Sequence, residues 1–311
     1  MTTSDTSTPV VFSIAAVERD TGIGKDTLRV WERRYGFPVP SRDAHDERSY
    51  PLVQVEKLRV IKRLMDQGHR PGRIVAQPIE ALLAMRQDNV GELKVLYAQS
   101  ERPEIEAFMA LLKAHDDEAL RLAMHQTLLE LGLQKFVTDI VAPMTRAVGE
   151  AWAQGELAVH EEHEFTECVT NLMRHAISLI PRSSATATPV VLLSTFPQEA
   201  HGLGLLMVES LLALQGCRCV SLGTQTPVRD IAQAALVRHV DVVALSFSAN
   251  MKVNHVVDGL KELTRLLPPT VQVWAGGQSS ALQRRNTAPV VVLRALGDVE
   301  KAVMLWRQAH A

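Results

Sequence analysis

The chain has 311 residues, of which 46% are hydrophobic and 22% are charged, and its formal net charge is −2 at pH 7. At roughly 100–200 residues per domain, this length predicts two or three domains with cores of their own, and the composition excludes a wholly disordered chain. The sequence has no run of about 18 apolar residues to cross a membrane, and its three cysteines form neither a disulfide framework nor a zinc-binding spacing.

Residues 1–10 are rich in serine and threonine, and this composition predicts a disordered N-terminus. They contain no basic stretch followed by an apolar run, so we expect no signal peptide. The protein is therefore expected to be cytoplasmic, under reducing conditions and without a membrane partner.

Residues 11–77 show short amphipathic helical patterns separated by abrupt turns. Ser13 is a good N-cap for the first helix, and further helices are expected over residues 25–35 and 52–67. The polar stretch 41–50 has the composition of a loop or wing. Two short helices joined by a glycine-containing turn predict a helix-turn-helix, which places its second helix in the major groove of DNA.

The distribution of charge supports this interpretation. Residues 11–76 carry 13 lysines and arginines against 9 acidic residues, a net charge of +4, whereas the rest of the chain is net negative. A basic segment on an acidic body suits a nucleic-acid-binding domain with a separate control domain. The residues expected to contact DNA are Lys25, Thr27, Arg29, Arg33, Arg42 and Arg48.

The segment TLRVWERRYG at 27–36, followed by RSY at 48–50, resembles the MerR-type regulators. The resemblance implies a winged helix-turn-helix that binds a double-stranded DNA operator. Trp31 and Tyr35 are expected in its core rather than on DNA. MerR-type metal and drug sensors usually continue into a long dimerisation helix, which this chain lacks, so dimerisation and sensing are expected in residues 78–311.

Residues 78–180 have a helix-forming composition and no strand pattern, which predicts a four-helix bundle domain. The stretch 181–189 is a linker by composition. The expected helices span about 79–98, 103–113, 116–131, 133–153 and 160–179.

From residue 190 to residue 311, near-continuous apolar runs alternate with helical patterns. This alternation predicts a parallel sheet covered on both faces, in a flavodoxin- or Rossmann-like α/β domain that binds its ligand at the carboxyl ends of the strands. The expected strands are 190–195, 219–224, 242–248, 271–277 and 289–295.

The loop after the first of these strands contains Glu199-x-His201-x-x-Gly204. An imidazole there can coordinate a metal through one ring nitrogen while the carboxylate orients it through the other, and glycine lets a bulky ligand approach the backbone. Taken alone, a histidine in a loop is more often a surface or hydrogen-bonded residue than a metal ligand. Small residues at two further strand ends would line the same cleft: Ser246, Ser248, Gly276 and Gly277.

This set resembles the cobalamin-binding domain of methionine synthase and related mutases, in which D-x-H-x-x-G is followed by S-x-L or S-x-T and then by G-G. The resemblance implies that His201 replaces the dimethylbenzimidazole base as the lower cobalt ligand. Glu199 stands in place of the aspartate and Ser248 in the third position of the second motif, and both keep their hydrogen-bonding capacity.

A third motif lies in the helical region, where nine residues separate Trp152 from Glu162-His163. Gly155 between them predicts that Trp152 ends one helix and that Glu162-His163 begins the next. Together the three motifs resemble the CarH/LitR photoreceptors, which are light-sensing MerR-type regulators that bind adenosylcobalamin. The resemblance implies that Trp152 caps the adenosyl group and that Glu162 and His163 hydrogen-bond around it.

One residue departs from this family. In some of these photoreceptors a histidine follows the tryptophan and takes the upper cobalt position after light breaks the Co–C bond, whereas here the residue is Ala153. His160, His163 or water would have to take its place.

The preferred interpretation is a light-responsive transcriptional repressor with adenosylcobalamin as its chromophore. In the dark, a homo-oligomer (a dimer or tetramer) would bind DNA through several linked helix-turn-helix modules, and light would dissociate it. One alternative is a regulator of the same architecture that senses another cobalamin form, haem or redox state. A cobalamin-dependent enzyme is a weaker alternative, because a DNA-binding domain takes the place where a substrate-activating barrel would be needed.

Overall fold

The computed structural model describes residues 11–42, 46–66, 69–85, 102–181, 188–283 and 289–310. The chain divides into two compact units, Met1–Ser100 and Glu101–Ala311, and each is described by itself. The predicted disorder of residues 1–10 and most of the predicted linker at 181–189 lie outside the described residues. None of the described helices is long and apolar enough to cross a membrane.

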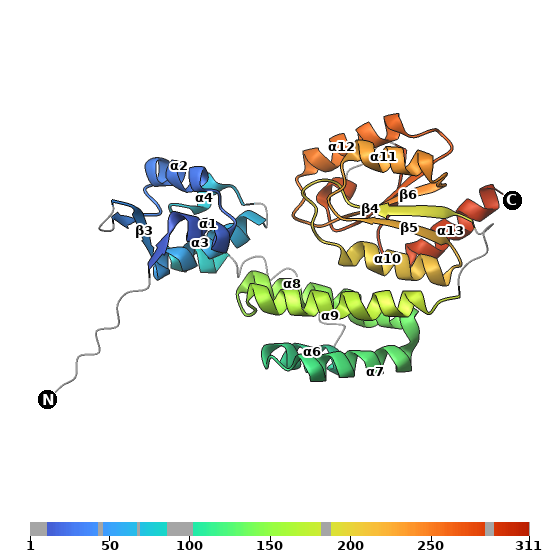
Figure 1. Ribbon diagram of the computed structural model, residues 1–311, viewed down its shortest axis with the longest axis horizontal. Coiled ribbons are helices and arrows are strands. Elements are labelled where there is room, and N and C mark those ends of the chain that lie inside the picture. Colours follow the sequence, from blue (N-terminus) through green and yellow to red (C-terminus); the bar gives the residue numbers. More distant parts are fainter. Residues whose placement is uncertain are drawn as a thin grey trace. The chain divides into compact units, whose positions relative to one another are not determined.

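The first unit is a winged helix-turn-helix (Figure 1). The Ser13 hydroxyl accepts the N–H of Ala16 at 3.3 Å, which confirms the predicted N-cap, and Gly22 ends the first helix with a φ of 68°. The three short strands form an antiparallel sheet in the order β1-β3-β2. Its elements are β1 (Val11–Ser13), α1 (Ile14–Thr21), α2 (Lys25–Tyr35), β2 (Ser41–Arg42), β3 (Arg48–Pro51), α3 (Leu52–Asp66) and α4 (Pro71–Ile74).

The core of this unit holds α2 and the wing strand β3 against α3. Leu28 and Tyr50 are fully buried and Trp31 is 4% exposed, while Tyr35 packs against the same cluster. The prediction that Trp31 and Tyr35 belong to the core is therefore confirmed. Residues 79–85 are helical, and the rest of the helix predicted up to residue 98 lies outside the described residues.

The second unit begins with the predicted bundle. The break expected between two of its helices is confirmed as a kink at Gly132, where φ is 74° and ψ is 160°. After this kink the chain adds one π-helical segment, η1 (Phe136–Val141), which the sequence pattern did not reveal. The α-helices of the bundle are α6 (Pro103–Lys113), α7 (Asp117–Lys135), α8 (Ala142–Gln154) and α9 (Val159–Ser178).

The remainder of this unit is a doubly wound domain whose parallel strands run in the order β5-β4-β6-β7-β8. This is the flavodoxin-like order, with a switch point between the first and third strands of the domain. All the predicted strands are confirmed. They are β4 (Val190–Ser194), β5 (Arg218–Gly223), β6 (Val242–Phe247), β7 (Gln272–Gly277) and β8 (Val290–Leu293).

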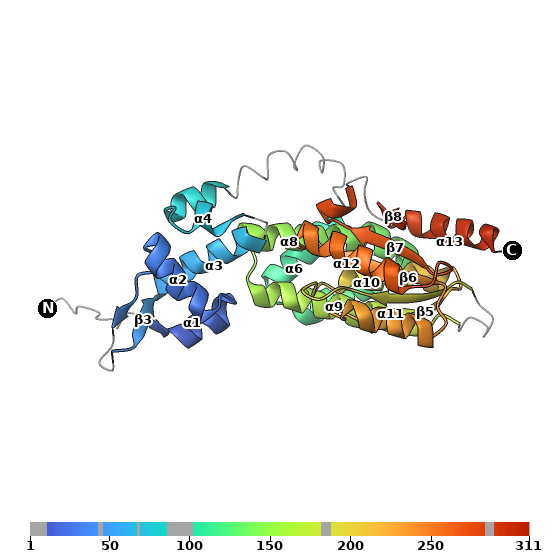
Figure 2. The same ribbon diagram turned by 90° about the horizontal axis from the view of Figure 1, so that it is seen from above.

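Helices cover both faces of the sheet. The face turned to the viewer in Figure 2 carries α11 (Val228–Val237) and α12 (Val253–Leu266). The opposite face carries α10 (Leu203–Leu214) and α13 (Asp298–Ala309). A short 3-10 helix, η2 (Ser280–Gln283), follows β7.

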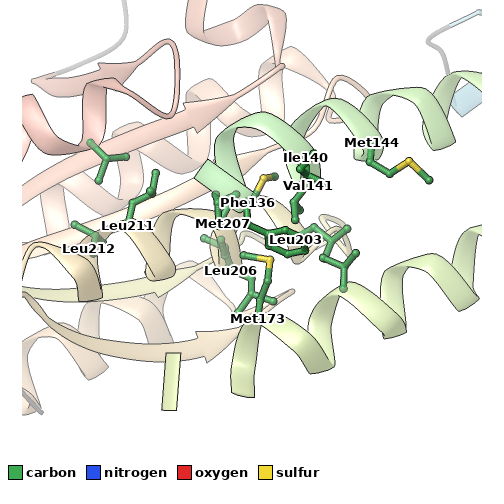
Figure 3. Close-up of a cluster of buried hydrophobic side chains, with 14 of the residues drawn as sticks. Phe136, Ile140, Val141, Met144, Met173, Leu203, Leu206, Met207, Leu211 and Leu212 are labelled. Carbon is green, nitrogen blue, oxygen red and sulfur yellow. The ribbon is translucent and has the colours of Figure 1, made fainter. Parts of the chain in front are cut away.

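The bundle and the sheet domain share one hydrophobic core, which forms around α10. Phe136 and Ile140 of η1 and Met173 of α9 are fully buried in the same cluster as Leu206 and Met207 of α10 (Figure 3). The apolar composition of α10 explains this position, because a helix that is hydrophobic on all sides is buried between two layers. The α10 helix thus joins the sheet to the bundle.

Candidate functional site

The loop after β4 holds a buried carboxylate against an exposed imidazole. The Glu199 side chain is 1% exposed, and its Oε1 lies 2.6 Å from Nδ1 of His201, whose side chain is 62% exposed. The second oxygen, Oε2, accepts the N–H of Ser248 at 2.6 Å. Glu199 therefore ties the loop after β4 to the loop after β6 while it orients His201.

The protonation state of this pair follows from its surroundings. Burial by itself would raise the pKa of Glu199, but the hydrogen bonds from His201 and from the Ser248 N–H outweigh it and hold the pKa below its ordinary value of 4.5. The carboxylate is ionised at neutral pH and can only accept, so Nδ1 of His201 carries the proton. In a neutral imidazole the lone pair then lies on Nε2, which is the arrangement of a metal-binding histidine.

The predicted glycines allow the chain to approach itself closely at the strand ends. A Cβ on Gly204, in the first turn of α10, would lie 2.5 Å from the hydroxyl oxygen of Ser246 in β6. Gly277 has a φ of 107°, and a Cβ there would clash with the carbonyl of Phe247. A Cβ on Gly276 would lie 3.3 Å from the carbonyl of Leu293. Packing within the chain is thus enough to require glycine at 277, whereas a side chain at 204 would require the Ser246 hydroxyl to rotate away.

One polar residue of this end of the sheet escaped the sequence analysis. Thr195 is fully buried, donates its hydroxyl to the carbonyl of Glu199 at 2.7 Å and accepts the N–H of Gln225 at 2.8 Å. It therefore joins the loop after β4 to the loop after β5. The sequence does carry one signal for Thr195, because it is a hydroxyl residue directly after an apolar strand, as Ser248 is after β6.

The arrangement fits a cobalamin with a histidine as lower ligand. It presents an exposed imidazole that a buried carboxylate orients, at the switch point where doubly wound domains bind their ligands. Ser248 supports the same carboxylate with both its backbone N–H and its hydroxyl, and both lower the pKa of Glu199.

The bundle places its predicted residues at the adjoining ends of two helices. Trp152 lies in the last turn of α8, which Gly155 ends with a φ of 69°, and Glu162 and His163 lie near the start of α9. Trp152 is half-buried and packs against the shared core. Figure 1 shows the turn between α8 and α9 at the same end of the second unit as the loops that follow β4 and β6.

The polar side chains at the start of α9 interact locally. Glu162 accepts the hydroxyl of Thr166 at 3.0 Å and lies 3.5 Å from Nε2 of His163. His163 is 70% exposed. His160, which the sequence offers as another upper cobalt ligand, stacks on His115 with 5.6 Å between the ring centroids.

The predicted DNA-contacting residues of α2 are accessible. Lys25, Arg29 and Arg33 follow one another at intervals of four residues and thus lie on one face of the helix, and Thr27 is also exposed. Lys25 receives support from α1, because Glu18 accepts its backbone N–H at 3.0 Å and lies 3.4 Å from its ammonium group. Glu18 in this way caps the start of the helix.

The two predicted arginines of the wing have different surroundings. Arg42 is exposed and forms an ion pair with Asp46 at 3.2 Å. Arg48 instead donates its Nε hydrogen to Glu32 of α2 at 2.9 Å, and Tyr50 donates its hydroxyl to the same carboxylate at 2.6 Å. The tip of the wing at 43–45 lies outside the described residues.

Three segments of the chain match known families. Residues 12–76 match the MerR HTH family regulatory protein. Residues 104–177 and 189–305 match two models that are both described as a B12 binding domain. The first segment covers the winged helix-turn-helix, and the other two cover the bundle and the doubly wound domain.

Two relatives share nearly this whole architecture. The HTH-type transcriptional repressor CarH of Myxococcus xanthus is 30% identical over 266 residues, which cover 83% of this chain and 86% of the relative. The HTH-type transcriptional repressor CarA of the same organism is 28% identical over 305 residues, covering 97% and 98% of the two chains. Among solved structures, the Methanosarcina barkeri monomethylamine corrinoid protein has the same fold over 64% of this chain and 96% of its own, with 16% identity and a TM-score of 0.52.

Proposed function

This chain belongs to the family of MerR-type transcriptional repressors that includes CarH and CarA, and we propose that it is a repressor controlled by adenosylcobalamin and light. The chain is a DNA-binding regulator with B12-binding domains. The observation that carries the more specific proposal is the exposed His201 imidazole, oriented by the buried Glu199 carboxylate at the switch point of the sheet. Bound adenosylcobalamin would supply a cobalt–carbon bond that light cleaves.

The residues that would hold this cofactor come from both parts of the second unit. Nε2 of His201 is the proposed lower cobalt ligand, and Glu199 fixes the orientation of its ring. Trp152 would cover the adenosyl group, with Glu162 and His163 as its hydrogen-bonding partners. The tail of the cofactor would pass the strand ends that Gly204, Ser246, Ser248, Gly276 and Gly277 form.

The DNA-binding surface of the proposal is α2 together with the wing. Several copies of this surface in one homo-oligomer, a dimer or tetramer, bind an operator far more tightly than one copy does. The cofactor can control DNA affinity only if it binds the oligomer-forming conformation better than the other conformation. The end of the bundle that carries Trp152 is proposed to make this difference, because it would contact the adenosyl group directly.

A second candidate function is a regulator of the same architecture that responds to another cobalamin form, haem or redox state. Ala153 favours it, because the histidine that some photoreceptors place after the tryptophan is absent, and His160 stacks on His115. The absorption spectrum of the protein with each cofactor, before and after green light, decides between the candidates. The enzyme alternative gains no support from CarH and CarA, since both are named as transcriptional repressors.

His201→Ala should weaken cobalamin binding by about 10–100-fold and shift the cobalt spectrum toward the base-off form. The remaining contacts to the corrin explain why some binding should persist. Titration followed by visible absorption measures both effects. His175→Ala is the matched control, because this exposed histidine lies in the last turn of α9. Wild-type affinity and spectrum in His201→Ala would show that the ligand assignment is wrong.

Arg29→Ala should cost about 1–3 kcal/mol of DNA-binding free energy if the side chain contacts a base. If it contacts only phosphate, binding should weaken for all sequences and the dependence of affinity on salt should become less steep. Gel-shift titrations at several salt concentrations distinguish these outcomes, with Arg238→Ala in the second unit as a control of equal charge. Unchanged binding by a folded Arg29→Ala variant would remove α2 from the DNA interface.

A further inference from the structure

We propose that Glu32 is a positioning residue for DNA binding, which fixes the wing to α2 so that the arginines of both elements reach one DNA molecule together. This inference rests on the proposed DNA-binding surface and adds a residue that does not itself contact DNA. It starts from the position of a carboxylate in the middle of a basic helix. Because DNA is negatively charged, a carboxylate at this position would by its charge alone oppose DNA binding.

The Glu32 carboxylate connects α2 to two residues of the wing strand β3. Its Oε2 accepts the Nε hydrogen of Arg48 at 2.9 Å, and its Oε1 accepts the hydroxyl of Tyr50 at 2.6 Å. The side chains of Glu32 and Arg48 are 15% and 31% exposed. A charge-assisted pair of this kind is both short and directional, and it is less screened by water than a surface pair.

The Tyr50 hydroxyl keeps its proton over the physiological range. Burial raises the pKa of Tyr50 above its ordinary value of 10.0, and the hydrogen bond to Glu32 raises it further. The residue is fully buried in the core of the first unit. The carboxylate therefore always has a donor on β3, and the strand cannot turn away from α2 without breaking a buried hydrogen bond.

The position of β3 determines that of Arg42. The antiparallel register pairs Arg42 with Arg48 and Ser41 with Ser49, so β2 moves with β3. Glu32 follows Arg29 and precedes Arg33 in α2. One carboxylate thus sets the distance between the exposed arginines of the helix and the exposed arginine of the wing. Arg48, predicted from the sequence as a DNA contact, takes part in this connection as the partner of Glu32.

The test is a double-mutant cycle of Glu32→Gln and Arg42→Ala in the full chain. The probe is a DNA fragment that the wild-type protein selects from a random-sequence pool. Glu32→Gln should weaken binding about tenfold, because hydrogen bonds to charged groups typically contribute this much. Arg42→Ala should then lose most of its effect in the Glu32→Gln background, because the wing is no longer held in place.

Two controls separate positioning from charge and from folding. Glu56→Gln removes a negative charge from an exposed position of α3 in the same unit, and this variant should bind DNA as tightly as the wild type or more tightly. Tyr50→Phe keeps the ion pair and the buried ring, and it should show a smaller loss with a smaller coupling to Arg42 of the same sign. If Glu32→Gln does not fold, the double-mutant cycle with Arg42→Ala is measured with Tyr50→Phe instead.

The proposal is overturned if Glu32→Gln binds DNA at least as tightly as the wild type, or if the effects of Glu32→Gln and Arg42→Ala simply add. Measuring the DNA affinity of Arg29→Ala separates a failure of the positioning role of Glu32 from a failure of the proposed DNA-binding surface. If Arg29→Ala loses DNA affinity while the effects of Glu32→Gln and Arg42→Ala simply add, only the positioning role of Glu32 is rejected. No loss with Arg29→Ala rejects the DNA-binding surface itself.

Discussion

Trp152→Ala should weaken the binding of adenosylcobalamin by about 3–5 kcal/mol, the usual effect of removing a large aromatic side chain from a packed site. Trp152 lies in the last turn of α8, half-buried against the shared core, at the end of the bundle proposed to enclose the adenosyl group. The variant should therefore lose affinity for the form of the cofactor that carries the adenosyl group. Titration followed by visible absorption measures the affinity.

Hydroxocobalamin is the matched ligand for this experiment, because it lacks the group that Trp152 is proposed to cover. Its affinity should change little, and this corrects for any general destabilisation of the bundle. Size-exclusion chromatography in the dark should show that the variant no longer assembles with adenosylcobalamin. Normal assembly of the variant would contradict the photoreceptor mechanism. So would a wild-type protein whose size does not depend on the cofactor in darkness or in light.

Gly277→Ala should lower the free energy of unfolding by about 2–6 kcal/mol, since backbone strain and overpacking each contribute about 1–3 kcal/mol. The φ of 107° is unfavourable for any residue with a Cβ, and the added carbon would clash with the carbonyl of Phe247. That carbonyl also accepts the N–H of Gln278 at 2.9 Å, so it cannot move freely. The ends of β6 and β7 would separate, at the place proposed for the tail of the cofactor.

Urea denaturation followed by circular dichroism measures this loss of stability. Gly297→Ala is the control in the same domain, because Gly297 has a φ of −64° and open space where a Cβ would be. The control should change the stability by less than about 0.5 kcal/mol. Equal stability of the two variants would show that the loop after β7 tolerates a side chain.

The sequence was most informative where one residue pattern has a single structural meaning. The five apolar runs from Val190 onward predicted every strand of the parallel sheet, because strands that are buried on both faces have few polar residues. The glycines also marked true breaks, at Gly132 inside the bundle and at Gly155 after Trp152. Both positions have a positive φ that other residues rarely adopt.

Features that depend on distant parts of the chain were not predictable in this way. The strand β1 has only three residues, and it exists because it pairs with β3 about forty positions later. The hydrogen bond of Glu32 to Arg48 and the contacts of Thr195 likewise join separate segments. The π-helical segment η1 has the sequence FVTDIV, and its β-branched residues lower the helix propensity without distinguishing a π-helix from an α-helix.

The core that the bundle shares with α10 restricts how the two can move. Lifting the bundle off the sheet like a hinged lid would expose Phe136, Leu206 and Met207 to water, at about 25 cal/mol per Å² of apolar surface. A small shear motion, in which packed helices slide along one another, keeps these side chains covered. The flexible side chains of Met173 and Met207 suit such an interface, because methionine repacks easily. His201 lies two residues before α10, next to the N-cap Gly202, so a change at its ring would reach the sliding surface through the first turn of that helix.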